Sequence, residues 1–318
     1  MYKILVTGGA GFIGSHICES ILKNFEVKKL VILDHLTYSG KKIYLKNILK
    51  LKNVEFIKED ILNLYKIKNK FKNFDIAINL AAESHVDRSF KDSINFTKTN
   101  TLGAHIFMQT CVDSNIKKIM HVSTDEVYGQ VLTNSKSEKD RLNPTNPYSA
   151  SKAAAEVIIN SYDFFQKKKI IIVRANNIYG IRQFPEKLIP SCIFNILKNK
   201  KIKIHGNGKN IRCFLSVLDF SDAINTLLRK NVSGIFNIGN NKCYRNIDVA
   251  KTICKIMKKK TQKTLIFVKD RLFNDFRYSV SSFKIKKLGW KPKRNLKNDL
   301  PFIIEWYKKN IFIYKSKV

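Results

Sequence analysis

Short apolar runs alternate with helical patterns through the first half of this 318-residue chain. Each run is short and ends at polar residues or glycine, which is typical of a buried strand. The runs cover residues 4–7, 30–34, 54–59, 76–82, 119–124 and 170–175. Strands that alternate with helices build βαβ units, so the pattern predicts an α/β fold with a doubly wound parallel sheet and helices on both faces.

The pattern changes after residue 180, where prolines at 185 and 190, a glycine turn at 206–208 and shorter elements follow. This change predicts a smaller, interleaved C-terminal domain that faces the substrate. Residues 214–219 and the pattern after them indicate a strand and a helix that return to the first domain. We therefore expect a nucleotide-binding domain at 1–178 and 214–238, and a substrate domain at 179–213 and 239–318. A hydrophobic content of 44% supports a full core.

Basic residues dominate the charged positions, with 59 lysines and arginines against 25 acidic residues and a net charge of +34. They are spread along the chain, for example at 41–42, 167–169, 258–260 and 286–287. This spread favours a solvated surface, with a general attraction of anionic substrates as the alternative. The sequence contains no known nucleic-acid motif, so we expect no nucleic-acid partner.

Six cysteines lie at positions 18, 111, 192, 213, 243 and 254, without metal-ligand spacing. We expect reduced thiols, because the pattern lacks the density of a disulfide framework. The histidines lack acidic or cysteine companions, so no metal is expected. No secretory signal precedes the strand at residue 4 and no apolar stretch is long enough to cross a bilayer, so we expect a cytoplasmic protein without a membrane partner.

Gly8, Gly11 and Gly14 form a glycine-rich turn between the first strand and a helical pattern at 15–22. Glycines in this context let the backbone turn tightly and approach a pyrophosphate, and the helix N-terminus favours the anion. Asp34 ends the next strand, where an acid is expected to bind an adenosine ribose. Because an acid there repels a 2′-phosphate, the pattern predicts a Rossmann-type domain that binds NAD rather than NADP.

Four kinds of proton-handling group lie shortly before the middle of the chain. Tyr148 and Lys152 stand one helical turn apart and share a face, so the ammonium is expected to lower the pKa of the phenol and make it a base. Asp125 and Glu126 come directly after the strand at 119–124, at the sheet edge where parallel-sheet enzymes keep their chemistry. Two carboxyls in different surroundings can be tuned apart, one protonated and one ionised.

These residues resemble the extended short-chain dehydrogenase/reductases, and within them the nucleoside-diphosphate-glucose 4,6-dehydratases. The similarity runs over nearly the whole chain, through motifs at 7–14, 36–40, 60–61, 81–89, 123–129, 148–152, 184–190, 206–212, 270–278 and 288–290. Epimerases of this fold share the glycine turn, Tyr148 and Lys152 but generally lack the acid pair. Since water elimination needs both an acid and a base, Asp125 and Glu126 favour a dehydratase.

The resemblance implies a lyase that dehydrates dTDP-glucose to dTDP-4-keto-6-deoxyglucose with NAD, with UDP-glucose as the alternative substrate and 4-epimerisation as a rival reaction. Tyr148 would take the proton of the hydroxyl at carbon 4, Thr124 would hydrogen-bond that oxygen, and Lys152 would hold the phenolate and a cofactor ribose. Glu126 would then remove the proton at carbon 5, Asp125 would protonate the hydroxyl that leaves carbon 6, and the hydride would return to carbon 6. The implied cofactor contacts are Gly8, Gly11, Phe12, Ile13, Gly14, Asp34, Asp60, Ile61, Ala81, Ala82, Tyr148 and Lys152.

The same resemblance implies a set of contacts to the nucleotide sugar, namely Ser84, His85, Asn177, Lys187, Leu188, His205, Arg212, Asn246, Arg271 and Asn274. Arginines suit bidentate phosphate contacts, and for His85 we prefer a positional role beside the sugar over a catalytic acid. His205 and Asn274 depart from the bacterial dTDP-glucose enzymes, which usually have tyrosine and histidine there. Residues 270–278 are more similar to the UDP-glucose dehydratases of plants and some large viruses, so the base stays open.

Helical patterns at 99–113 and 150–166 carry apolar stripes. In this family such helices pair across a two-fold axis into a four-helix bundle, so a homodimer is expected. The alternative is that both stripes bury against their own sheet. A rival function of a different class is a basic binding protein that has kept an enzyme fold without turnover.

Overall fold

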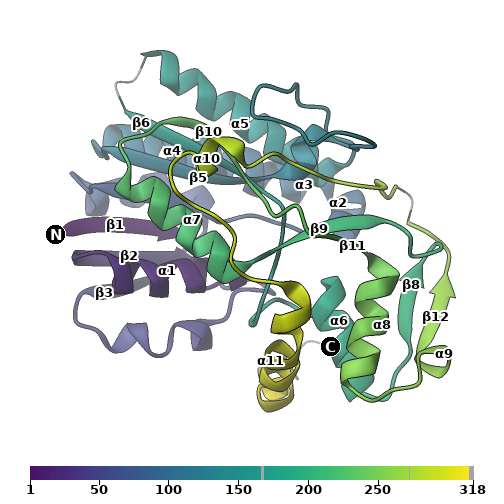
Figure 1. The fold of residues 1–318 in the computed structure, drawn as a ribbon. Helices are drawn as coiled ribbons and strands as arrows, with labels where there is room; N and C mark the ends of the chain where they lie inside the picture. Colours follow the sequence, from purple (N-terminus) through teal and green to yellow (C-terminus); the bar gives the residue numbers. More distant parts are fainter. Residues whose placement is uncertain (166–167, 272, 315–318) are drawn as a thin grey trace.

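A seven-stranded parallel sheet forms the centre of the molecule, with the order β10-β6-β5-β4-β1-β2-β3 (Figure 1). The computed structural model describes residues 1–165, 168–271 and 273–314. Its seven main strands are β1 (Tyr2–Thr7), β2 (Val27–Asp34), β3 (Val54–Lys58), β4 (Ile76–Asn79), β5 (Lys118–Thr124), β6 (Lys169–Ala175) and β10 (Gly234–Ile238). The predicted α/β class, the parallel sheet and all six predicted strands are confirmed, apart from shifts of a few residues at their ends.

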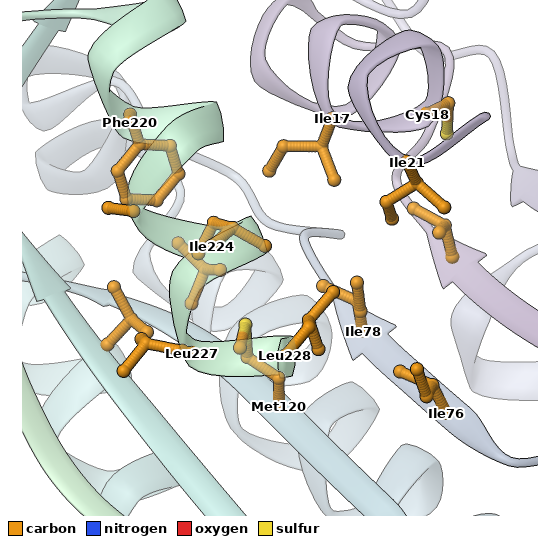
Figure 2. Close-up of a cluster of buried hydrophobic side chains, with 14 of the residues drawn as sticks. Ile17, Cys18, Ile21, Ile76, Ile78, Met120, Phe220, Ile224, Leu227 and Leu228 are labelled. Carbon is orange, nitrogen blue, oxygen red and sulfur yellow. The ribbon is translucent and has the colours of Figure 1, made fainter. Parts of the chain in front are cut away.

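Helices cover both faces of this sheet because its strands alternate their buried side chains between the two faces. On one face, Ile4 and Val6 of β1 belong to a cluster that includes Ile17 of α1 (Phe12–Asn24) and Ile224 of α7 (Val217–Arg229). Figure 2 shows both helices over this cluster. On the other face, Leu5 of β1 joins side chains of η3 (Ile61–Phe71), α4 (Gly103–Asp113) and α5 (Pro147–Phe165).

The predicted helices lie within these elements. The pattern at 15–22 falls inside α1, and the pattern at 99–113 is divided between a π-helical turn η4 (Thr97–Leu102) and α4. The pattern at 150–166 lies inside α5, except that residue 166 is outside the described residues. Ala104, Phe107 and Ile159 of α4 and α5 are buried against the sheet, so much of both apolar stripes is already covered within one chain.

A second, smaller layer of structure lies beside the carboxyl ends of the main strands. It contains the strands β7 (Asn177–Tyr179), β9 (Ile211–Ser216) and β11 (Cys243–Arg245) in one sheet, and β8 (Ile202–His205) with β12 (Leu265–Val268) in another. Its main helices are α6 (Leu188–Leu197), α8 (Asn246–Ile256) and α11 (Leu296–Lys309). They enclose a core of their own, in which the rings of Phe194, Tyr307 and Tyr314 pack edge to face or tilted.

The remaining helical elements are short. They are the helical turns η1 (Lys42–Leu45), η2 (Ile48–Lys50), η5 (Asp125–Tyr128) and η6 (Ile311–Tyr314), and the short helices α2 (Val86–Lys91), α3 (Ser93–Phe96), α9 (Thr261–Thr264) and α10 (Phe283–Lys286).

The segment at 214–238 divides between the two layers. Its first residues belong to β9, which pairs with β7 and β11 in the small sheet, whereas α7 packs on α1 and β10 pairs with β6 at the edge of the main sheet. The chain therefore returns to the main sheet through α7 and β10 rather than through β9. The domain limits expected from the sequence stay a prediction.

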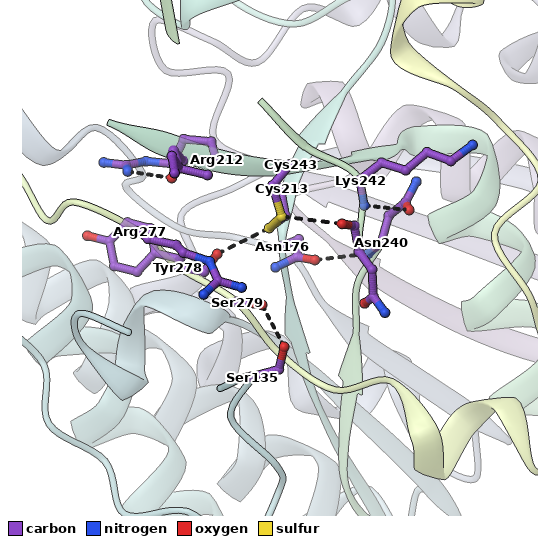
Figure 3. Close-up of a disulfide and its surroundings, with 12 residues drawn as sticks. Ser135, Asn176, Arg212, Cys213, Asn240, Lys242, Cys243, Arg277, Tyr278 and Ser279 are labelled. Carbon is purple, nitrogen blue, oxygen red and sulfur yellow. Dashed lines mark hydrogen bonds between the residues drawn. A yellow bond between two sulfur atoms is a disulfide. The ribbon is translucent and has the colours of Figure 1, made fainter. Parts of the chain in front are cut away.

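Cys213 and Cys243 form a disulfide, so the expectation of six reduced thiols is wrong for this pair (Figure 3). The physical reason is the strand register, since β9 and β11 run antiparallel and place these two residues directly opposite each other. The sequence hides this pairing because 30 positions separate the two cysteines. The other four, Cys18, Cys111, Cys192 and Cys254, are buried free thiols.

Within residues 1–165, 168–271 and 273–314, no helix combines the length and apolar character needed to span a bilayer. The same part of the chain holds no group of three or more His, Cys, Asp or Glu side chains arranged to bind a metal ion.

Candidate active site

The glycine-rich turn joins β1 to α1 at the point where the strand order reverses. β2 and β3 lie on one side of β1 and β4 lies on the other, so the carboxyl ends of β1 and β4 form the switch point of the sheet. Gly8 has a φ of +72°, and a Cβ atom there would lie 2.5 Å from the Ala81 nitrogen. At Gly14 an added Cβ would collide with the Gly8 carbonyl oxygen. Only glycine fits this close approach of turn, helix and strand end, as the sequence predicted for a phosphate-binding turn.

Asp34 lies beside this turn at the end of β2. One carboxylate oxygen, Oδ2, accepts a hydrogen bond of 2.9 Å from the Ala10 N–H, and Oδ1 accepts one of 2.8 Å from the Leu36 N–H. These bonds hold the carboxylate at the rim of the turn. Asp60 comes just after β3, the strand next to β2. Its side chain caps η3 by accepting a 2.9 Å hydrogen bond from the Leu62 N–H.

A cavity of about 630 Å³ opens between the main sheet and the smaller layer. Most predicted site residues line it: Gly8, Gly11, Phe12, Ile13, Gly14, Ala82, Ser84, His85, Thr124, Asp125, Glu126, Tyr148, Lys152, Asn177, Lys187, Leu188, His205, Arg212, Asn246, Arg271 and Asn274. Four predicted cofactor contacts do not line this cavity within the part of the chain that the structure describes. They are Asp34, Asp60, Ile61 and Ala81. Asp34 is the last residue of β2, whereas the other three come just after β3 or β4, so all four lie at the carboxyl edge of the sheet.

Asp125 and Glu126 begin η5 at the end of β5, and both face the cavity. Burial, followed by the charge of Glu126, raises the pKa of Asp125 to about 7. Its Oδ2 accepts a 2.6 Å hydrogen bond from the Asn176 side chain. Burial also raises the pKa of Glu126, whereas Arg212 and Lys187 oppose the rise by favouring the ionised form. The site therefore offers a carboxyl that holds a proton near neutral pH beside one that faces two cations.

Tyr148 and Lys152 lie in the first two turns of α5 and line the same cavity, as their spacing predicts. Burial and the neighbouring charges of Glu126 and Asp125 raise the pKa of Tyr148, and a hydrogen bond with Thr124 only partly offsets this. The phenol pKa is therefore raised rather than lowered, against the expectation from the sequence. Burial itself lowers the pKa of Lys152 to about 8, so the ammonium still predominates at neutral pH but begins to lose its proton just above it.

Three basic side chains gather where the sequence predicts the diphosphate. Lys187 donates to the Ser84 carbonyl over 2.6 Å, and Arg212 donates to the Asn274 side-chain oxygen over 3.2 Å. The third, Arg271, pairs with Asp87 at 3.2 Å.

Two further groups at this end of the cavity have a buried polar atom without a partner among the described residues, namely Nδ1 of His205 and Oδ1 of Asn246. Unpaired buried polar atoms that line a cavity suit a polar ligand.

A sequence model described as GDP-mannose 4,6 dehydratase matches residues 5–300. This chain belongs to that family. The "dTDP-D-glucose 4,6-dehydratase" of Dictyostelium discoideum is 40% identical over 97% of this chain and 82% of its own length. A trifunctional Arabidopsis thaliana protein, "UDP-glucose 4,6-dehydratase/UDP-4-keto-6-deoxy-D-glucose 3,5-epimerase/UDP-4-keto-L-rhamnose-reductase RHM2", is 39% identical over 97% of this chain. The chain spans about half of that longer protein, 47%.

The fold of this dehydratase family member also matches a solved structure closely. DesIV of Streptomyces venezuelae, a dTDP-glucose 4,6-dehydratase crystallised with NAD and TYD, superposes with a TM-score of 0.95. The two chains are 32% identical, and the match covers 98% of this chain and 99% of the other.

Sequence reasoning missed two asparagines of this site. Asn176 binds Asp125, and Asn146 hydrogen-bonds Glu126, which favours the ionised glutamate. Asn176 directly follows β6, so a polar residue at the carboxyl end of a parallel strand was a usable signal. Asn146 lies just before α5 and carries no comparable mark in the sequence.

Proposed function

We propose that this protein dehydrates dTDP-glucose to dTDP-4-keto-6-deoxyglucose, in a reaction that needs NAD. The observation that carries the proposal is the convergence of Tyr148, Asp125 and Glu126 on one cavity, with Asp125 able to keep a proton near neutral pH. Two carboxyls of unequal proton affinity are what an elimination of water requires. The match to dehydratases of this reaction over nearly the whole chain supports the same conclusion.

The glycine turn and Asp34 fit a dinucleotide, because the turn is closed to any added Cβ at Gly8 and Gly14 and the carboxylate is fixed at its rim. When bound, NAD supplies the ring that accepts a hydride from carbon 4 of the sugar and returns it to carbon 6. Tyr148 takes the proton from the hydroxyl at carbon 4. Thr124 hydrogen-bonds the same oxygen, and the ammonium of Lys152 stabilises the phenolate and holds a ribose hydroxyl.

The ketone formed at carbon 4 acidifies the proton at carbon 5. Glu126 removes this proton, which agrees with the two cations, Arg212 and Lys187, that favour its ionised form. Asp125 donates its proton to the hydroxyl that leaves carbon 6, which agrees with a pKa of about 7. As carbon 6 then receives the hydride, Glu126 returns a proton to carbon 5, which completes the 4-keto-6-deoxy product. An epimerase needs neither group, so the acid pair supports dehydration over epimerisation.

The nucleotide is held by the basic end of the cavity in this proposal, with Lys187, Arg212 and Arg271 toward the diphosphate. UDP-glucose is the second candidate substrate. It is favoured by the 39% identity with the Arabidopsis protein, whose name includes UDP-glucose 4,6-dehydratase, and by His205 and Asn274 at the nucleotide end.

Parallel incubations with dTDP-glucose and UDP-glucose, each with NAD, test the proposal by mass spectrometry. We expect a product that has lost one water and carries one solvent deuterium at carbon 5 when the reaction runs in D₂O. The ratio of kcat/KM for the two substrates identifies the nucleotide. A product of unchanged mass with an inverted carbon 4 would mean an epimerase. Salt-sensitive binding of nucleic acid without turnover of either sugar would instead favour a basic binding protein.

We also propose a homodimer that places α4 and α5 against a partner. Leu102 of η4 and Val157 of α5 support it, because they are 48% and 64% exposed on elements that pack side by side. Sedimentation of the wild type and of a Val157→Asp variant tests this interface. The cytoplasmic location and the two-domain division are likewise proposals, and cell fractionation and limited proteolysis test them.

A further inference from the structure

Three polar side chains form a ladder across the main sheet beneath the glycine turn. Thr7, Asn79 and His121 are register partners on the adjacent strands β1, β4 and β5. All three are buried, with exposed fractions of 0%, 1% and 1%. The ladder ends at Lys152, whose Nζ lies 3.3 Å from Nε2 of His121 and donates to the Val122 carbonyl over 2.7 Å.

The orientation of Asn79 is fixed by a group that can only donate. The backbone N–H of Ala81 donates to the Asn79 side chain over 3.1 Å, so the atom it meets must be the carbonyl oxygen Oδ1. The Thr7 hydroxyl donates to the same oxygen over 2.7 Å. The Asn79 Nδ2 group, which can only donate, therefore faces Nδ1 of His121 at 3.2 Å.

This polarity decides the tautomer of His121. Because Nδ1 accepts from Asn79, it carries no proton, and the single proton of a neutral ring sits on Nε2. A neutral ring is expected here, since burial and then Lys152 lower the pKa of His121 well below its usual range. The Nε2–H group consequently points at the nitrogen of Lys152. A neutral lysine amine can accept this hydrogen bond, whereas an ammonium, which has no lone pair, meets it as a second donor.

We propose that His121 is a positioning residue that sets the proton balance of Lys152, because Asn79 holds its ring as the neutral Nε2–H tautomer and thereby favours the uncharged amine. The direction of the hydrogen bonds from Ala81 through Asn79 to His121 follows from the structure and does not depend on the proposed function. Its consequence for catalysis rests on the proposed function, in which Lys152 stabilises the phenolate of Tyr148.

Other charged groups around Lys152 act differently. Glu156, one turn further along α5, raises the pKa of Lys152, but its Oε2 already accepts hydrogen bonds of 2.9 and 2.6 Å from Arg174 of β6. The phenol of Tyr148 lies on the same helix one turn before Lys152, and Asp125 and Glu126 of η5 face that phenol. Among these side chains, His121 is the one whose Nε2–H group points at the Lys152 nitrogen in this proposal. The charge on Lys152 should therefore be lost just above neutral pH.

Nitrogen NMR of protein labelled with ¹⁵N-histidine tests the tautomer directly, without substrate and with or without NAD. The chain has six histidines, and the signals lost in a His121→Gln variant assign His121. We expect a neutral Nε2–H ring from about pH 6 to about pH 9. A neutral ring protonated at Nδ1, or a ring that titrates within this range, overturns the proposal.

Asn79→Asp tests the coupling, since a carboxylate at this position accepts from both neighbours and should move the histidine proton to Nδ1. Nε2 would then accept from an ammonium, so Lys152 should hold its proton to higher pH. In single turnovers with dTDP-glucose, absorbance of reduced NAD should show the alkaline loss of rate shifted upward by about one pH unit.

Thr7→Val is the matched control, because it removes a donor to Asn79 but leaves the Ala81 N–H that fixes the amide. It should keep the Nε2–H tautomer and the alkaline limb of the wild type. An Asn79→Asp protein that folds with both readouts unchanged contradicts the coupling. If neither sugar is turned over, the proposed function fails, whereas the NMR result for the wild type still decides the tautomer.

Discussion

Replacing Asp125 by asparagine should remove an ionisation that weakens the folded protein above neutral pH. Burial and Glu126 raise the pKa of this carboxyl from 3.8 to about 7. A raised carboxyl pKa contributes stability that is complete below the unfolded value and is lost as pH rises through the folded value. The full rise corresponds to about 4 kcal/mol, of which about 3 kcal/mol falls between about pH 5 and about pH 8.5. Asparagine has no proton to lose, so the variant should escape this loss.

Equilibrium urea unfolding of both proteins at several pH values measures the effect. The free energy of unfolding of Asp125→Asn minus that of the wild type should grow by about 3 kcal/mol from about pH 5 to about pH 8.5. Any constant cost of the substitution, such as a weaker bond with Asn176, cancels in this comparison. Asp163→Asn, at an exposed position of the same helix as Lys152, serves as the control and should give a nearly flat difference. A difference that is flat for Asp125→Asn as well would refute the raised pKa.

The same variant should lose dehydration by about 10²- to 10⁴-fold while it still reduces NAD in a single turnover with substrate, because the proton for the leaving hydroxyl is missing. Glu126→Gln should likewise reduce elimination by about 10²- to 10⁴-fold and stop deuterium entering carbon 5, while NAD binding persists; unchanged dehydration would remove the glutamate from its role. Tyr148→Phe should block the first oxidation, and a variant that still reduces bound NAD on adding substrate contradicts the base assignment. Gly8→Ala should cost about 1–3 kcal/mol of stability and weaken NAD binding in calorimetry, because the added Cβ meets the Ala81 backbone at 2.5 Å and φ is +72°; wild-type affinity would show that the turn can adjust.

The parts of the site that the sequence predicted well are those encoded by neighbouring residues at strand ends. Gly8 follows β1 and Asp34 ends β2, and in a parallel sheet the carboxyl ends of such strands meet at one edge. Tyr148 and Lys152 share a helix face through their spacing alone. In each case local geometry and a shared edge are enough to bring the groups together.

The parts that escaped prediction depend on register or on burial. The bond between Cys213 and Cys243 requires the pairing of β9 with β11, and the ladder from Thr7 to His121 requires three strands in one register. His121 sits inside an otherwise apolar run, where alternation alone marks it only as a core residue. Burial likewise reverses the expected sign of the Tyr148 pKa, because desolvation and two nearby carboxyls outweigh the bond with Thr124.

Asp125 and Glu126 have different proposed roles because their side chains meet different neighbours. Both are buried, yet Asp125 meets the neutral amide of Asn176, whereas Glu126 faces the two cations Arg212 and Lys187. Ionised Glu126 raises the pKa of Asp125, so the cations act on both carboxyls. They favour a charge on the glutamate, and that charge helps to hold the proton on the aspartate, while Arg212 also acts on Asp125 directly and lowers its pKa. Removing Arg212 would therefore disturb the acid as well as the base. The net charge of +34 is much less informative than these two placed cations, since charges spread over a solvated surface are screened within about 10 Å at ordinary salt.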